Sequence, residues 1–169
     1  VVRARTVQFY QINFAEYAQT VPVETFRPDA ATADLEKART LLSSAGSDIS
    51  AWSAGEGASV RTSRVEAELK PGKGLAVFSA KRGGRIVGLR ISPASALAGP
   101  DRSVTLRIAF DGEALPAVNC PAGDFFGFSW GRPAARSLLF GTEGDTCYAY
   151  FPMPFERSAR VELVQARPD

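Results

Sequence analysis

The side chains best suited to chemistry lie in one stretch, residues 118–155, which combines many aromatic rings with glycines and a few carboxylates. Asp124 is followed directly by Phe125 and Phe126, and Trp130 comes a few residues later. Aromatic faces can stack on a ligand, and a carboxylate among them can hydrogen-bond a ligand or acquire a perturbed pKa. These four residues are therefore the predicted binding residues.

Each of these residues also has a structural interpretation. Asp124 could cap its own loop by accepting bonds from nearby backbone N–H groups. Trp130, which lies beside Gly131, could pack in a core or an interface. The whole stretch could be a loop that packs its aromatic rings beneath a β-sandwich. Composition alone does not decide between binding and packing.

The absence of histidine narrows the possible chemistry. Ser-His and Cys-His catalysis and His-ligated metals are excluded within this chain, and we expect neither a metal nor a cofactor. Proton transfer near neutral pH would have to use Asp, Glu, Tyr, Cys or Lys. Glu113 is expected to be a solvated hairpin residue, and Glu156 a surface partner of Arg157 or Arg160. The acids in the aromatic stretch or a few residues from its ends are Glu113, Asp124, Glu143, Asp145 and Glu156.

Composition places the chain among ordinary globular domains. Its 169 residues are 45% hydrophobic and 22% charged, with a net charge of +2. No apolar run reaches membrane-spanning length, and the arginines are dispersed, so we expect neither a membrane nor a nucleic-acid partner. The only methionine is Met153, which indicates a processed chain or a piece of a longer protein, and the compartment stays open.

The two cysteines, Cys120 and Cys147, both lie in the aromatic stretch. A disulfide between them would stabilise the fold by about 3 kcal/mol in the chain-entropy model. Two buried free thiols are an equally good interpretation, because two cysteines in a chain of this length do not make a disulfide framework.

The N-terminal third predicts few regular elements. Residues 6–14 alternate like a strand, with Tyr10, Ile12 and Phe14 on one side, and residues 21–26 form a second short extended piece. Apolar spacing predicts a helix over residues 32–45. Residues 47–57 form a small polar linker around Trp52, which we expect to dock on a neighbouring part of the chain.

From residue 60 onward the pattern predicts strands separated by Gly, Pro and Asp turns. Asp111 and Gly112 give the strongest short hairpin signal. Many short strands at nearly regular spacing predict an all-β fold, an antiparallel β-sandwich or jelly roll with one short N-terminal linker helix. The predicted strands are 64–69, 75–80, 86–92, 103–110, 115–120, 147–151 and 159–164.

Two segments carry a family resemblance. They read FDGEALPAVNCPAGDFFGFSWG and CYAYFPMPFERSARVEL. They resemble the motifs of glycoside hydrolase family 172, formerly catalogued as domain of unknown function 2961, and the match is strongest over residues 104–163. Ala149 and Tyr150 stand as an insertion between the CY and FP parts of the family's last motif. The matching residues are Asp111, Gly112, Pro121, Gly123, Asp124, Phe125, Phe126, Gly127, Trp130, Gly131, Cys147, Tyr148, Phe151, Pro152, Met153, Pro154, Phe155, Ser158 and Ala159.

The resemblance implies jelly-roll domains in oligomeric enzymes that act on furanosides, of the alpha-D-fructofuranosidase, difructose-anhydride synthase or D-arabinofuranosidase type. It implies a carbohydrate partner and homo-oligomers formed through jelly-roll faces, and Asp124, Phe125, Phe126 and Trp130 are the candidate residues for binding that substrate. The alternative function is a non-catalytic jelly roll for sugar binding or subunit assembly.

One departure from the family pattern affects the expected organisation. The family's YYQI-type strand follows the MPF strand and precedes the acidic catalytic segments, whereas FYQINF here lies at residues 9–14. We therefore expect a tail of one jelly roll over residues 1–26, a helical linker over 27–57, and a jelly roll over 58–169. No catalytic role is transferred to Glu143, and the isolated chain is expected to be inactive.

Overall fold

The computed structural model describes residues 13–25, 27 and 32–166. The fold is all-β, and every pair of strands within its sheets is antiparallel, which confirms the predicted class. No helix among these residues is both long enough and apolar enough to cross a membrane. The helices are α1 (Thr32–Ser43), α2 (Ser50–Ala54) and α3 (Ala122–Phe125), with a 3-10 turn, η1 (Ala94–Leu97). The strands are β1 (Gly74–Ala80), β2 (Gly84–Ile86), β3 (Leu89–Ile91), β4 (Val104–Phe110), β5 (Val118–Pro121), β6 (Phe128–Ser129), β7 (Arg132–Pro133), β8 (Phe140–Glu143), β9 (Thr146–Ala149), β10 (Met153–Phe155) and β11 (Ala159–Gln165).

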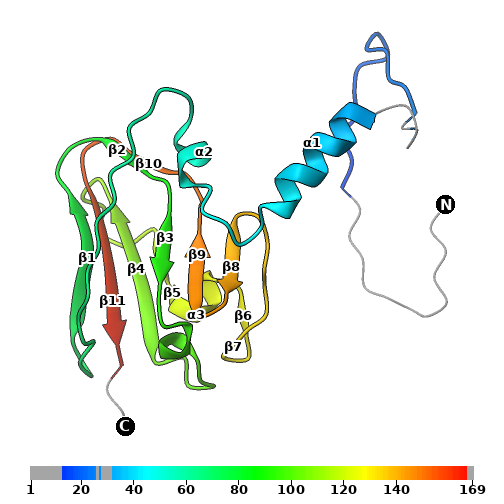
Figure 1. Ribbon diagram of the computed structural model, residues 1–169. Helices are drawn as coiled ribbons and strands as arrows, with labels where there is room; N and C mark the ends of the chain where they lie inside the picture. The colour runs from blue at the N-terminus through cyan, green and yellow to red at the C-terminus, as the bar shows by residue number, and fades with distance from the viewer. Residues whose placement is uncertain (1–12, 26, 28–31, 167–169) are drawn as a thin grey trace.

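The first layer is a four-stranded sheet in the order β1-β11-β4-β5 (Figure 1). β11 lies between β1 and β4, with Val161 opposite Phe78 on one side and Ile108 on the other. Its pairing with β4 runs without interruption from Ala159 to Gln165. This central strand therefore holds together two strands that are distant in the sequence.

The second layer is the three-stranded sheet β3-β9-β8, which a two-stranded ladder of β2 and β10 extends. The sequence predicts one strand over residues 86–92, but the structure divides it into β2 and β3. The break lies opposite residues 150–152, where Pro152 has no N–H to donate to a ladder. The N–H of Tyr150 instead donates to the carbonyl of Leu139 at 2.7 Å.

The core between the layers follows from strand alternation. Leu106 and Ile108 on β4 and Val161 on β11 are buried in one cluster with Cys147 and Ala149 on β9. Side chains at every second position of a strand point to the same face, so each strand supplies the core from one side. The apolar alternation predicted for residues 103–110 is confirmed here, because Val104, Leu106 and Ile108 are all buried.

Both cysteines are free thiols. Cys147 is completely buried in the core, whereas Cys120 on β5 is partly exposed. Burial raises the pKa of both thiols. The sequence allowed either a disulfide or two free thiols, and the structure shows two free thiols.

The helix predicted over residues 32–45 is present as α1, which extends away from the two sheets (Figure 1). Most of the strand predicted over residues 6–14, including Tyr10 and Ile12, lies outside the described residues. Phe14 belongs to no strand of the described chain and is 82% exposed. The extended piece predicted at 21–26 forms no strand over residues 21–25, and Phe26 lies outside the described residues.

Two further expectations were wrong. Residues 64–69 alternate like a strand, yet the whole segment 58–70 pairs with no strand of the described chain. An alternating sequence shows which side chains would share a face of a strand. Strand pairing also needs an unpaired edge of a sheet at hydrogen-bonding distance. Trp52 does not dock on a neighbour within the described residues, because 66% of its surface is exposed.

Asp111 fixes the crossover between the two layers. At φ +54° it follows β4, and its carboxylate accepts backbone N–H bonds from Glu156, Arg157 and Ser158 at 3.1, 2.6 and 3.0 Å. Its own N–H donates to the Ser158 carbonyl at 2.8 Å. The bonds from Ser158, Arg157 and Glu156 lower the pKa of the Asp111 carboxyl. The residue thus joins the end of β4 to the turn between β10 and β11.

We predict that Leu106→Ala lowers the free energy of unfolding by about 2–5 kcal/mol, because it opens a cavity at the centre of the core. Chemical denaturation measures this loss directly. Leu115→Ala is the matched control: Leu115 is largely exposed, so its truncation should change stability by less than about 0.5 kcal/mol. Equal effects of the two substitutions would contradict this description of the core.

We also predict that Asp111 makes the fold sensitive to acid. Because its folded pKa lies below the ordinary value of 3.8, its contribution is present above that value and is lost as the pH falls through the folded pKa. Asp111→Asn should therefore lower the denaturation midpoint near neutral pH and flatten its fall below about pH 4. Glu113→Gln, an exposed carboxylate on the same turn, is the control. An unchanged acid profile in Asp111→Asn would refute the role of the carboxylate.

Candidate functional site

The aromatic loop begins where β5 passes into the single turn α3. Phe126 has no exposed surface and lies in the main core, so it packs rather than presenting a face to solvent. Phe125 is partly buried and makes edge-to-face contacts with Phe126 and Phe151, at centroid distances of 5.3 and 6.2 Å. This half of the loop caps the core, as the packing interpretation of the sequence predicts.

Asp124 points instead toward a neighbouring loop. Its Oδ2 atom accepts a hydrogen bond from Nη1 of Arg102 at 2.9 Å, and about a third of the Asp124 side chain is exposed. The turn itself is closed by backbone bonds, including Gly127 N–H to the Asp124 carbonyl at 3.0 Å. The carboxylate therefore pairs with Arg102, and an exposed pair of this kind contributes only about 0–1 kcal/mol to stability.

Trp130 lies at the tip of the hairpin formed by β6 and β7. Ser129 pairs with Arg132, which leaves Trp130 and Gly131 as a two-residue turn with φ of +54° and +71°. Such a turn favours Asn-Gly, and a bulky side chain at positive φ is strained. Trp130 is nevertheless 88% exposed, so packing within the described chain does not compensate for this strain. Strained backbone of this kind is concentrated at functional sites.

Gly131 attaches this hairpin to the loop that carries Arg102. A Cβ atom on Gly131 would lie 2.1 Å from the carbonyl oxygen of Gly99, so no other residue fits here. The N–H of Gly99 donates to the Gly131 carbonyl at 2.9 Å, and the N–H of Arg102 donates to the Gly99 carbonyl at 3.3 Å. Trp130, Arg102 and Asp124 therefore lie on loops that these bonds join, and we call this set of residues the Trp130 surface.

The structure thus divides the predicted binding residues. Asp124 and Trp130 are accessible on the Trp130 surface, Phe125 lies partly buried beside them, and Phe126 is enclosed in the core. Sugar binding by this set stays a prediction. Arg102 was missed because it precedes Asp124 by many residues in a loop without a motif. Only the folded chain brings its guanidinium to the carboxylate.

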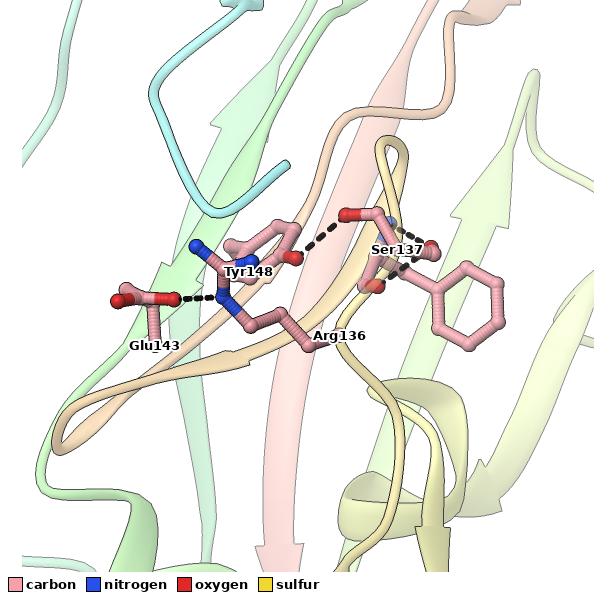
Figure 2. Close-up of polar contacts among 5 residues, drawn as sticks. Arg136, Ser137, Glu143 and Tyr148 are labelled. Carbon is pink, nitrogen blue, oxygen red and sulfur yellow. Dashed lines mark hydrogen bonds and ion pairs between the residues drawn. The ribbon is translucent and has the colours of Figure 1, made fainter. Parts of the chain in front are cut away.

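A second polar cluster lies on the outer face of the sheet β3-β9-β8 (Figure 2). Nε of Arg136 forms a short ion pair with Oε2 of Glu143, and the Tyr148 hydroxyl donates to the Ser137 carbonyl at 2.5 Å. Burial raises the pKa of Tyr148, and the hydrogen bond that Arg136 donates to Glu143 raises the pKa of Arg136. Glu143, to which no catalytic role was given, is here an ion-pair partner.

The linker docks on this same face through Ile49 rather than through Trp52. Ile49 is buried in a small cluster with Tyr148 and Tyr150. The Ser53 hydroxyl donates to the Tyr150 carbonyl at 3.0 Å, and Asp48 Oδ2 lies 3.8 Å from Arg90 Nη1. Burial raises the pKa of Asp48, but hydrogen bonds from Ser50 and the charge of Arg90 give a net lowering.

Two cavities adjoin this docked linker. A cleft of about 1850 Å³ lies between residues 58–67 and the open side of the sandwich, and it reaches core residues such as Leu106 and Val161. A small cavity of about 70 Å³ is lined by Gly46, Arg90, Glu143, Thr146, Tyr148 and Tyr150. Arg90, Thr146 and Tyr150 line both.

Comparison with known proteins assigns the family. The model of the GH172 domain-like family matches residues 59–169, which is most of the chain. The chain belongs to this family. It is therefore a domain of a glycoside hydrolase family, and the resemblance found in its two motifs is confirmed. No curated protein matches it.

The motif residues of this GH172 domain have different structural roles. Asp111 holds the crossover, Phe126 fills the core, and Gly131 allows close contact with Gly99. Trp130 has no structural role of this kind in the described chain. Its side chain is 88% exposed, and its bulk is unfavourable at the positive φ of its turn. Among these four motif residues, Trp130 is therefore the one best explained by contact with something outside the domain.

We predict that Trp130→Asn stabilises the domain by about 1 kcal/mol, because Asn-Gly suits this turn and Trp does not. Thermal or chemical denaturation measures the gain. Trp52→Asn is the control: Trp52 is also exposed but lies in α2, where Trp and Asn have similar helix propensities, so this substitution should give no such gain. A loss of stability in Trp130→Asn would show that Trp130 packs against the domain.

Proposed function

We propose that this GH172 domain belongs to a furanoside-active hydrolase and that its Trp130 surface binds the sugar. The observation that carries the proposal is a strained, 88% exposed Trp130 attached to the loop of the Arg102–Asp124 ion pair. An aromatic face stacks on the apolar face of a sugar ring, while a guanidinium and a carboxylate satisfy its hydroxyls. Membership of the GH172 domain-like family supports a carbohydrate as the ligand.

Asp124 and Arg102 would position the sugar rather than cleave its bond. A glycosidase needs two carboxyl groups, about 5–5.5 Å apart in retaining enzymes and about 6.5–9.5 Å apart in inverting ones. On the Trp130 surface, Asp124 is already paired with Arg102. We therefore propose that the catalytic carboxylates come from other segments of the parent protein, as the family resemblance suggests.

A direct binding experiment tests this function. The chain has two tryptophans, so Trp52→Phe leaves Trp130 as the only fluorescent indole. We predict a saturable change in its fluorescence on titration with methyl furanosides, and a smaller change with a methyl pyranoside. Asp124→Asn and Arg102→Gln should each weaken binding by about three- to tenfold, because each removes hydrogen bonds to the ligand.

Leu115→Ala, an exposed apolar truncation, is the matched control and should leave binding unchanged. The absence of a saturable change up to about 100 mM ligand, well above a millimolar Kd, would contradict the proposal.

We further predict that the isolated 169-residue chain does not hydrolyse aryl furanosides above the rate of the buffer. The reason is that Asp124 is held in an ion pair with Arg102 and that we assign the catalytic carboxylates to other segments, and the loss of either carboxylate typically removes most of the rate of a glycosidase. Release of the chromogenic aglycone measures the rate. Turnover that disappears in Asp124→Asn, with the fold intact, would show that the chemistry is complete on this surface.

The alternative function is subunit assembly without sugar binding. Leu42 on α1 and Trp52 on α2 favour it, since both apolar side chains are exposed on helices outside the two sheets. Light scattering after gel filtration distinguishes the two functions. Assembly predicts an oligomer that Leu42→Ser or Trp52→Ser dissociates, whereas these substitutions should leave the fluorescence titration of Trp130 unaffected.

A further inference from the structure

The small cavity on the outer face of the sheet β3-β9-β8 carries an inference of its own. Strand β9 and the residue after it alternate strictly. Cys147 and Ala149 point into the core, so Thr146, Tyr148 and Tyr150 share the opposite face. Thr146, Tyr148 and Tyr150 all line the cavity. The strand thus presents three hydroxyl groups on the face where the linker docks.

Two of these hydroxyls lack a partner. The Tyr148 hydroxyl donates to the Ser137 carbonyl, but those of Tyr150 and Thr146 make no hydrogen bond with any described residue. Tyr150 is only 1% exposed, and its ring stacks on Tyr148 with centroids 5.5 Å apart. No buried side-chain oxygen or nitrogen of the described residues lacks a hydrogen-bond partner, so the Tyr150 and Thr146 hydroxyls are accessible at the cavity and are available to a ligand.

The charges around the cavity cancel. Arg136 pairs with Glu143, and Arg90 lies 3.8 Å from Asp48. No net charge therefore selects an anion or a cation. Oε1 of Glu143 remains available as an acceptor among the described residues, because the ion pair uses Oε2. The lining thus offers neutral donors and acceptors above a stacked aromatic pair, a combination that suits hydroxyl groups.

The size of the cavity limits what can enter. Its volume of about 70 Å³ corresponds to roughly two water molecules at ~30 Å³ each. A whole sugar ring does not fit, but a hydroxymethyl group or one end of a small diol does. Gly46 closes one side at φ +86°, where a Cβ atom would lie 2.6 Å from Oε2 of Glu143. A larger residue at this position would therefore distort the wall of the cavity.

We propose that this cavity binds a neutral vicinal diol or hydroxymethyl group, with Tyr150, Thr146 and Glu143 as its hydrogen-bonding partners. The exocyclic arm of a furanose and free glycerol share this chemistry. The site uses none of the residues of the Trp130 surface, so it is a binding function beyond the one proposed above. Because Arg90, Thr146 and Tyr150 also line the large cleft, a longer ligand could enter from that side.

The experiment uses the full chain with Trp130→Ala, which removes the other surface from the measurement. Amide chemical shifts are followed by NMR during titration with glycerol, with a methyl furanoside and with 2-propanol, which has a single hydroxyl. We expect saturable shifts at Thr146, Tyr148 and Tyr150 with glycerol or the furanoside and none with 2-propanol. Tighter binding of the furanoside would identify the sugar arm as the ligand, and tighter binding of glycerol the free polyol.

Two substitutions make the result specific. Tyr150→Phe keeps the stacked ring and removes one hydroxyl, and Thr146→Val keeps the shape and removes another; each should weaken binding about five- to tenfold. Tyr17→Phe, on an exposed tyrosine outside the cavity, should change nothing. Unchanged affinity in both cavity variants, or no saturable shift at residues 146–150, would overturn the proposal. Either result leaves the Trp130 surface untouched, so the two proposals fail separately.

Discussion

The hydrogen bonds to the Asp111 carboxylate are the interaction on which the arrangement of the two layers depends. They hold three successive N–H groups of residues 156–158 at the end of β4, where the chain passes from the second layer back to the first. From there β11 enters the sheet in register with β4, which places Val161 opposite Ile108 in the core. The core and the loops that it supports therefore depend on one polar crossover.

Much of the fold could be predicted from local patterns, because burial imposes them. Residues 103–110 alternate since one face of β4 is buried. The helical spacing of residues 32–45 also predicted α1, although residues 33–43 of this helix include no buried residue. The pattern failed where partners are distant in the sequence. It could not show that residues 64–69 find no edge to pair with, nor that Asp111 turns its carboxylate to residues 156–158 instead of only closing a hairpin. These outcomes are decided by three-dimensional contacts that no local pattern contains.

The candidate site was predictable in composition but not in arrangement. A run of aromatic residues indicates both packing and binding, and the structure divides the run between the two: Phe126 belongs to the core, and Trp130 to the surface. Arg102 and the cavity beneath the docked linker came from the structure alone. Both depend on contacts between segments that are far apart in the chain. Arg102 pairs with Asp124, and Ile49 of the linker packs against Tyr150.

The central position of β11 has a consequence for synthesis of the protein on the ribosome. β1 and β4 are made well before residues 159–165, yet both pair with that strand. Until those residues leave the exit tunnel, the nascent chain exposes two unpaired strand edges and the apolar face that Val161 later covers. Non-local pairing of this kind also folds slowly. We therefore expect the nascent domain to be a substrate for chaperones that bind unpaired, apolar strands during translation.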